Sequence, residues 1–251
     1  MLVYLEVVFL CRFLNLKGRN VIMNILKSSI LFFLPICFGS CSSQYQVQGV
    51  SSESILDGQM AYLKTLEPNG QYKPLDSCEV LHGKFTMCGP LDSVVCVRLM
   101  LGDNIFVPIV LEEGNVKVVI ENSSIKIEGT TLNDRLYTFL NSRDSLAMMR
   151  AELPKKESEM YIEGYSQDEV VSQLADEEMQ LNRALDKLET QFISDNFDNV
   201  LGVTWFIELC KQANLTFGYP TTTPQIDELY GRAPESFRRQ KDIADYMRRC
   251  K

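Results

Sequence analysis

The stretch VKVVIENSSIKIEG, Val116–Gly129, decides the fold. Apolar residues occupy alternate positions on both sides of a central turn: Val116, Val118, Ile120, Ile125 and Ile127. Charged residues fall on the opposite face: Lys117, Lys126 and Glu128. Because strand side chains point alternately to the two faces of a sheet, this pattern predicts two strands that are apolar on one side. One-sided burial of this kind is typical of an antiparallel sheet packed on a partner layer.

The same kind of pattern extends upstream as far as Tyr45. About eight strands are predicted, near 45–50, 58–66, 75–81, 84–89, 94–101, 105–111, 116–121 and 125–129. They recur at intervals of roughly 8–12 residues, which indicates a β-sandwich or a partly open barrel. Pro108 lies inside one of these runs and cannot donate a ladder hydrogen bond, so its strand is expected at an edge or a bulge.

The segment LDSCEVLHGKFTMCG, 75–89, predicts a hairpin whose two turn residues are His82 and Gly83. In that register Val80 faces Phe85, and Cys78 faces Met87. Cys88 then points to the other face from Cys78, so these two thiols are not expected to bridge. A bulged three-residue turn would shift this register.

The period becomes helical after Gly129. Thr131 or Asn133 is expected to cap a first helix, which Pro154 closes. Ser166 and Glu169 form a capping box for a long helix that runs to about Asp195. Its apolar stripe comprises Val170, Leu174, Leu181, Leu185, Leu188 and Phe192. Further helices are predicted at 199–211, from Pro224, and over 234–250, which gives an α+β fold with an all-helical C-terminal region at 130–251.

Residues 23–41, MNILKSSILFFLPICFGSC, have the pattern of a signal peptide. Lys27 supplies the positive start, 28–38 the apolar region, and the small residues Gly39 and Ser40 precede Cys41. The small pair before cysteine resembles the lipobox of bacterial lipoproteins, which implies cleavage at 23–40 and lipidation of Cys41. The alternatives are a plain signal peptide with an incidental cysteine, and an uncleaved anchor. Residues 1–22 are interpreted as a non-translated segment upstream of a start at Met23, or as an extra membrane segment.

Five cysteines follow the targeting segment: Cys78, Cys88, Cys96, Cys210 and Cys250. No pair has the C-x-x-C spacing of thioredoxin-type redox sites or zinc ribbons. Their odd number leaves at least one free thiol. Buried free thiols that act as small apolar groups are therefore predicted.

The β segment resembles a known family of domains of unknown function, DUF4369. The resemblance rests on the hairpin 75–89, on VLEEGNVKVVI at 110–120, and on the step Gly129-x-x-x-Asn133-Asp134. It covers about Tyr45 to Asn141 and defines a domain at 41–129. The family implies an envelope lipoprotein in which this domain commonly precedes a thioredoxin-like domain of the AhpC/TSA type. That domain and its C-x-x-C motif are absent from this sequence, so the resemblance implies no redox activity and no catalytic residues.

The remaining chemistry of the sequence favours no reaction. The net charge of −8 argues against nucleic acid as a partner, because phosphate binding needs a basic surface. The single histidine, His82, lies in a predicted turn, and no catalytic, cofactor-binding or metal-ligating constellation is visible.

The predicted function is that of a non-enzymatic interaction or binding module, anchored to the membrane of the cell envelope through Cys41 and facing the periplasm. Its partner is expected to be another envelope protein. The alternative is an accessory to periplasmic thiol–disulfide exchange that partners a separate thioredoxin-like protein through a thiol such as Cys250. A weaker hypothesis is capture of a ligand between the β layer and the helices.

Overall fold

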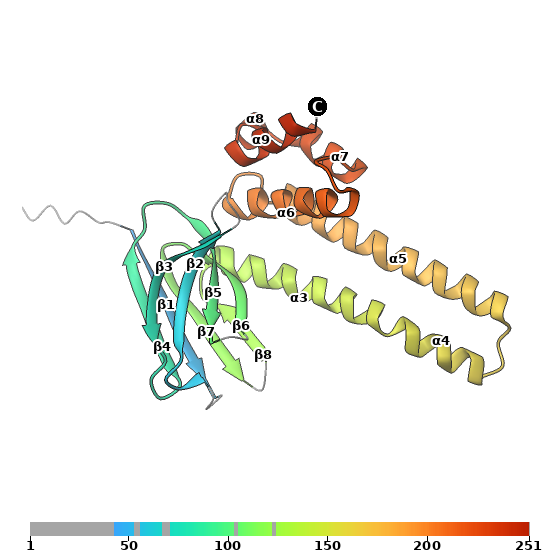
Figure 1. Cartoon of the computed structure of the whole chain (residues 1–251), viewed down its shortest axis with the longest axis horizontal. Helices are drawn as coiled ribbons and strands as arrows, with labels where there is room; N and C mark the ends of the chain where they lie inside the picture. Colours follow the sequence, from blue (N-terminus) through green and yellow to red (C-terminus); the bar gives the residue numbers. More distant parts are fainter. Residues whose placement is uncertain (1–42, 53–55, 67–70, 103–104, 122–123, 251) are drawn as a thin grey trace, which may run out of the picture. The chain divides into compact units, whose positions relative to one another are not determined.

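The structure is a computed structural model that describes residues 43–52, 56–66, 71–102, 105–121 and 124–250 (Figure 1). These residues belong to one compact unit, Ser42–Lys251. Eight strands in two four-stranded open sheets come first, and helices follow. The α+β fold predicted from the sequence is therefore confirmed. Cys41, the predicted signal peptide at 23–40 and the segment 1–22 lie outside the described residues.

The two sheets each combine strands from distant parts of the chain. The first sheet has the order β4-β1-β7-β8, with bounds β4 (Lys84–Pro90), β1 (Gln44–Ser51), β7 (Gly114–Glu121) and β8 (Ser124–Glu128). The second sheet has the order β3-β2-β5-β6, with bounds β3 (Tyr72–Glu79), β2 (Met60–Leu66), β5 (Val95–Leu101) and β6 (Ile105–Leu111). Pro108 lies in β6 at the edge of its sheet, as predicted.

The inner faces of the two sheets form one apolar core. The first sheet contributes the alternating residues that the sequence singled out, and Val116, Val118, Ile120 and Ile127 are all buried. The second sheet contributes Leu63, Leu99 and Ile109 among others. In β1, β4, β5 and β7 the buried side chains alternate with more exposed ones, as expected for strands of a sandwich.

Five of the six strand pairings are antiparallel, as expected. The exception is β1, which pairs with β7 in parallel, so that Val47 lies opposite Val116. A parallel pair needs a long connection between its strands. Here strands β2–β6 supply that connection.

The predicted hairpin at 75–89 is correct only at its turn. Leu81 and Lys84 exchange two backbone hydrogen bonds, and His82 (φ 52°) and Gly83 (φ 69°) adopt the left-handed backbone of a type I′ turn. Beyond that pair the strands separate, because β3 and β4 belong to different sheets. The predicted facing of Val80 with Phe85 and of Cys78 with Met87 is therefore wrong.

The true partners of these strands come from elsewhere in the chain. Cys78 lies opposite Ala61 of β2, and Met87 lies opposite Val47 of β1. The Val80 amide donates to the Gln59 carbonyl, which draws the chain into the second sheet. Cys78 and Cys88 are both free thiols, as predicted.

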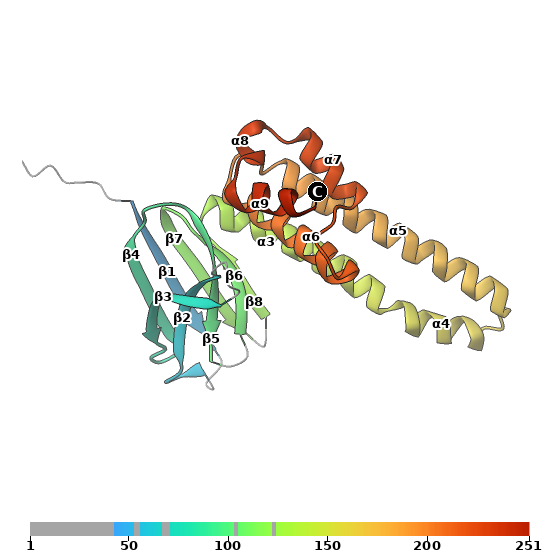
Figure 2. The same cartoon turned by 45° about the horizontal axis from the view of Figure 1, so that its top comes forward.

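The helical region contains α3 (Thr131–Ala151), α4 (Leu153–Ile162), α5 (Gln167–Ser194), α6 (Val200–Phe217), α7 (Pro224–Arg232), α8 (Glu235–Arg238) and α9 (Lys241–Arg249). The α5 helix runs back beside α3 and α4 (Figures 1 and 2). Its predicted capping box is present: the Ser166 hydroxyl accepts from the Glu169 amide, and the Glu169 carboxylate accepts from the Ser166 amide. Of its predicted stripe, Val170 and Phe192 are buried and the other four residues are half-buried.

Four predicted helix boundaries need correction. The helix predicted at 199–211 continues to Phe217 in α6. Pro154 does not end the helical region; it occupies the first turn of α4, where its missing N–H is not needed. The last predicted helix, 234–250, is two helices, α8 and α9. The cap of α3 is Thr130, and not Thr131 or Asn133.

Candidate functional site

The Asn133 side chain joins the sandwich to α3. It is fully buried, its Oδ1 accepts from the Val110 amide at 2.9 Å, and its Nδ2 donates to the Val110 carbonyl at 2.7 Å. The amide group thus pairs with the backbone of β6 as a neighbouring strand would. Because this carboxamide is used by β6, it cannot cap its own helix, which explains the incorrect prediction.

The amino end of α3 is satisfied by a distant carboxylate. Glu112, in the turn between β6 and β7, accepts from the Leu132 amide at 2.7 Å and from the Asn133 amide at 3.2 Å. A carboxylate at this end also interacts favourably with the helix dipole. The LEEG turn therefore fixes the position of α3.

Gly129 and Asp134 complete this junction. The Asp134 carboxylate accepts from the Gly129 amide at 2.9 Å. Gly129 has φ of 106°, and a Cβ atom there would lie 2.6 Å from the Asn115 carbonyl oxygen. Only glycine fits this position. The Gly-x-x-x-Asn-Asp step is therefore a structural joint.

A groove of about 500 Å³ opens beside this joint, between the outer face of the second sheet and α6. The sheet contributes Lys64, Thr65, Leu66, Tyr72, Val95, Cys96, Val97, Arg98 and Pro108. The helices contribute Leu136, Val200, Leu201, Val203, Thr204, Trp205, Ile207, Glu208, Lys211 and Asp242. Its volume lies within the range of small-molecule sites, roughly 300–1,000 Å³.

Two cations lie side by side on the sheet wall of the groove. Lys64 of β2 and Arg98 of β5 are directly opposite each other in the antiparallel register. Lys64 Nζ lies 4.8 Å from the ring centre of Tyr62, and the Arg98 guanidinium lies 5.3 Å from that of Phe106. Within the described part of the chain, neither cation has a carboxylate partner within ion-pair distance.

The helix wall of the groove is held rigidly by aromatic packing. Trp205 packs edge-on against Phe139 and Phe192, with ring centres 4.9 and 6.1 Å away. The Arg143 guanidinium lies 5.7 Å from the Trp205 ring centre. Trp205 is the only tryptophan in the sequence, so its fluorescence reports on this wall.

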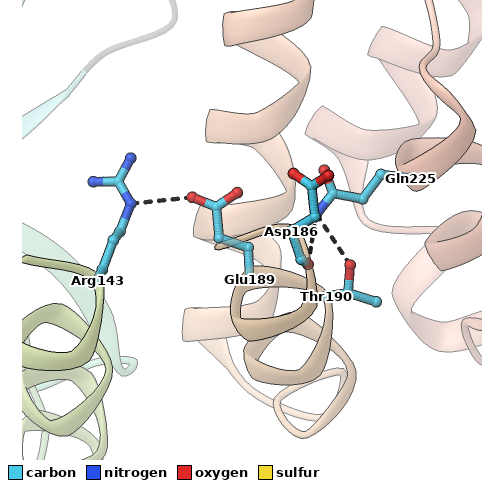
Figure 3. Close-up of polar contacts among 5 residues, drawn as sticks. All are labelled: Arg143, Asp186, Glu189, Thr190 and Gln225. Carbon is cyan, nitrogen blue, oxygen red and sulfur yellow. Dashed lines mark hydrogen bonds and ion pairs between the residues drawn. The ribbon is translucent and has the colours of Figure 1, made fainter. Parts of the chain in front are cut away.

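Polar contacts behind this wall tie three helices together (Figure 3). Arg143 of α3 donates to the Glu189 carboxylate of α5 at 3.0 Å, and Gln225 of α7 donates to the Asp186 carbonyl and to the Thr190 hydroxyl. Burial raises the pKa of Glu189 above its usual value, although the Arg143 ion pair opposes this shift. The contact of α3 with α5 thus contains a partly buried ion pair, Arg143–Glu189.

Four of the described thiols, Cys78, Cys96, Cys210 and Cys250, are poorly suited to nucleophilic chemistry. Cys96 lies on the groove wall, where burial raises the pKa of its thiol although a hydrogen bond with Thr204 lowers it. Burial likewise raises the pKa of Cys210 to about 12 and raises the pKa values of Cys78 and Cys250. Because the thiolate is the reactive form, such shifts lower reactivity at neutral pH.

The candidate residues named in the sequence analysis, His82 and the cysteines, do not form one site among the described residues. His82 is exposed in its turn, and Cys41 lies outside the described residues. Among the described residues there is no cluster of three or more potential metal ligands. The sequence predicted a ligand site only in general terms, between the β layer and the helices, and none of the residues that line the groove was named as a site residue. Arg98 was the available signal, because it interrupts the otherwise apolar run VVCVRLML.

The fold and groove define the protein as a two-sheet β-sandwich with a helical extension and a cationic, partly apolar groove between them. Residues 45–136 match the family described as "Domain of unknown function (DUF4369)". The match ends inside α3, so it includes the joint at Gly129, Asn133 and Asp134. No curated protein matches the chain. Over the described residues, no helix is both long and apolar enough to cross a membrane.

Proposed function

We propose that the chain is a non-enzymatic lipoprotein of the cell envelope, held on the membrane through acylated Cys41 and facing the periplasm. Its folded part is a binding module, and the groove between the second sheet and α6 is its binding surface. The observation on which this rests is the groove itself, where two cations without carboxylate partners among the described residues lie next to aromatic and aliphatic side chains.

The anchoring is supported by the sequence before Cys41. A short positive region, an apolar stretch and a small-residue pair precede this cysteine. Burial of acyl chains contributes about 0.8 kcal/mol per CH₂ group, so two or three chains hold a folded domain on a membrane. Metabolic labelling with radioactive palmitate tests this: the wild type should be labelled, and Cys41→Ser should not. Equal labelling of both would refute the anchor.

The binding role can be tested on protein purified from the envelope of the producing cell. Native mass spectrometry should detect a bound mass on the wild type. Thr204→Tyr places a bulky side chain in the groove and should remove that mass. Thr216→Tyr, an exposed position on the same helix that does not line the groove, is the matched control. An unchanged bound mass on Thr204→Tyr, or turnover of a substrate, would contradict the proposal.

The alternative role in thiol–disulfide exchange receives less support from the described thiols. Its candidate, Cys250, is half-buried against the helical core, and its raised pKa disfavours the thiolate. Cys88 of β4 is the exposed free thiol among the described residues. Trapping of a mixed disulfide with a thioredoxin-like protein through either thiol, and its loss in the corresponding Ser variant, would favour this role.

A further inference from the structure

We infer that the groove binds an anionic amphiphile, with its carboxylate between Lys64 and Arg98 and its apolar body along α6. This inference rests on the proposed binding role and specifies the ligand class. The first argument is the placement of the two cations. Strand alternation directs both side chains to the outer face of the second sheet, because Leu63, Val97 and Leu99 occupy the core face.

The second argument is energetic. Like charges directly opposite each other on neighbouring strands destabilise a sheet. The third cation of the groove, Lys211, has a carboxylate partner, because Glu208 lies 3.8 Å from it. Asp242 lines the groove from α9, but none of the ion pairs among the described residues joins it to Lys64 or Arg98. A bound carboxylate would remove the repulsion between the pair and gain two charge-assisted hydrogen bonds.

The third argument is the apolar surface next to the pair. Leu66 and Tyr72, on the strands beside Lys64, are 46% and 39% exposed. Val203, Trp205 and Ile207 of α6 line the same groove. A ligand that was only an anion would leave this surface in water, whereas a ligand with an apolar tail would bury it. Charge and apolar area together therefore select an amphiphile over a small inorganic anion.

The test uses three probes that share one tail: decanoate, 1-decanol and decylammonium. Each is titrated into the purified folded protein below its aggregation limit, and Trp205 emission is recorded. Decanoate should shift the emission and should bind at least about tenfold more tightly than 1-decanol, because its carboxylate can accept charge-assisted hydrogen bonds that the neutral hydroxyl cannot match. Decylammonium should bind most weakly.

Variants then assign the head-group site. Lys64→Gln and Arg98→Gln should each weaken decanoate binding about tenfold and leave 1-decanol unchanged. Arg98→Lys keeps the positive charge and should retain most of the affinity for decanoate. Weaker binding by Arg98→Gln would then result from the lost charge and not from misfolding. Lys84→Gln, on the other sheet, makes the same charge change as a control and should bind as the wild type does.

The outcomes separate this inference from the binding role beneath it. Equal affinity for decanoate and 1-decanol, or tighter binding of decylammonium, would overturn the anionic class while leaving the groove a binding surface. No binding of decanoate would also overturn the inference. In that case the binding role still depends on the mass-spectrometric comparison of Thr204→Tyr with Thr216→Tyr.

Discussion

At the scale of single residues, the amide of Asn133 determines how the sandwich meets the helices. It lies 23 residues from its partner Val110, and it satisfies both the N–H and the C=O of that residue. Buried backbone groups are costly when unpaired. One side chain, Asn133, therefore satisfies two buried backbone groups of β6 and holds α3 against the sandwich.

Asn133→Ala should lower the free energy of unfolding by about 3 kcal/mol, because it leaves two buried backbone groups of Val110 unpaired. Urea denaturation followed by circular dichroism measures this loss. Asn141→Ala, on the exposed face of the same helix, is the control and should change stability by less than about 0.5 kcal/mol. Similar small effects for both variants would refute the structural role of Asn133.

The Glu112 carboxylate acts from the preceding turn. Glu112→Gln should cost about 1 kcal/mol, since a neutral amide accepts the two α3 amides less strongly and loses the dipole interaction. Glu113→Gln changes the adjacent exposed charge and should have little effect. Urea midpoints of the two variants provide the comparison. A larger loss for Glu113→Gln would contradict this account.

At the scale of elements, the sequence predicted those strands and helix ends that depend on residues close to one another in the chain. Alternation placed the strands, and Ser166 with Glu169 marked the start of α5, because both signals depend on neighbours in sequence. Partner strands could not be predicted, because the choice of β1 for β4 and of β2 for β3 depends on distant residues. The prediction of the α3 cap was wrong for the same reason: the Thr130 cap makes no side-chain hydrogen bond, and Glu112, 20 residues before Leu132, accepts from the first amides instead. The groove was missed because its two walls are brought together only by the fold.

The start of α5 gives a prediction at this scale. Ser166→Ala removes both hydrogen bonds made by the Ser166 hydroxyl and should cost about 1 kcal/mol. Thermal unfolding measures the effect. Ser172→Ala, an exposed position inside the same helix, should be neutral or slightly stabilising, because alanine is the better helix former. Equal destabilisation by both changes would count against the capping box.

The junction of α3, α5 and α7 gives a pH dependence. In the folded state the pKa of Glu189 is raised, chiefly by burial, above the unfolded value of about 4.3. Between these two values the folded state binds more protons than the unfolded state, so stability should fall as pH rises through this window. Glu189→Gln should remove that part of the pH dependence. Stability curves of both proteins from pH 4 to pH 8 test this, and identical slopes would refute it.

At the scale of the whole described unit, one aromatic and aliphatic cluster links the two regions. Val110 of β6 packs with Leu136 and Phe139 of α3, Phe192 of α5 and Leu201 of α6. Tyr137 adds a hydrogen bond to the Pro108 carbonyl at 2.9 Å. Shared burial of this kind couples the stability of the sandwich to that of the helices.

We therefore expect the two regions to unfold together. The infrared band of the β-sheet and the emission of Trp205 should lose their native signals at the same urea concentration. Leu136→Ala should lower both midpoints equally, because its cavity lies in the shared cluster. Separate midpoints in the wild type would show that the cluster does not couple the regions.

The position of β1 has a mechanical consequence. This first strand is bonded to β4 on one side and to β7 on the other. A force applied at the amino end pulls along β1, and its hydrogen bonds lie across that direction. These hydrogen bonds share such a force and have to break together, so β1 resists extraction from the sheet more than an edge strand would.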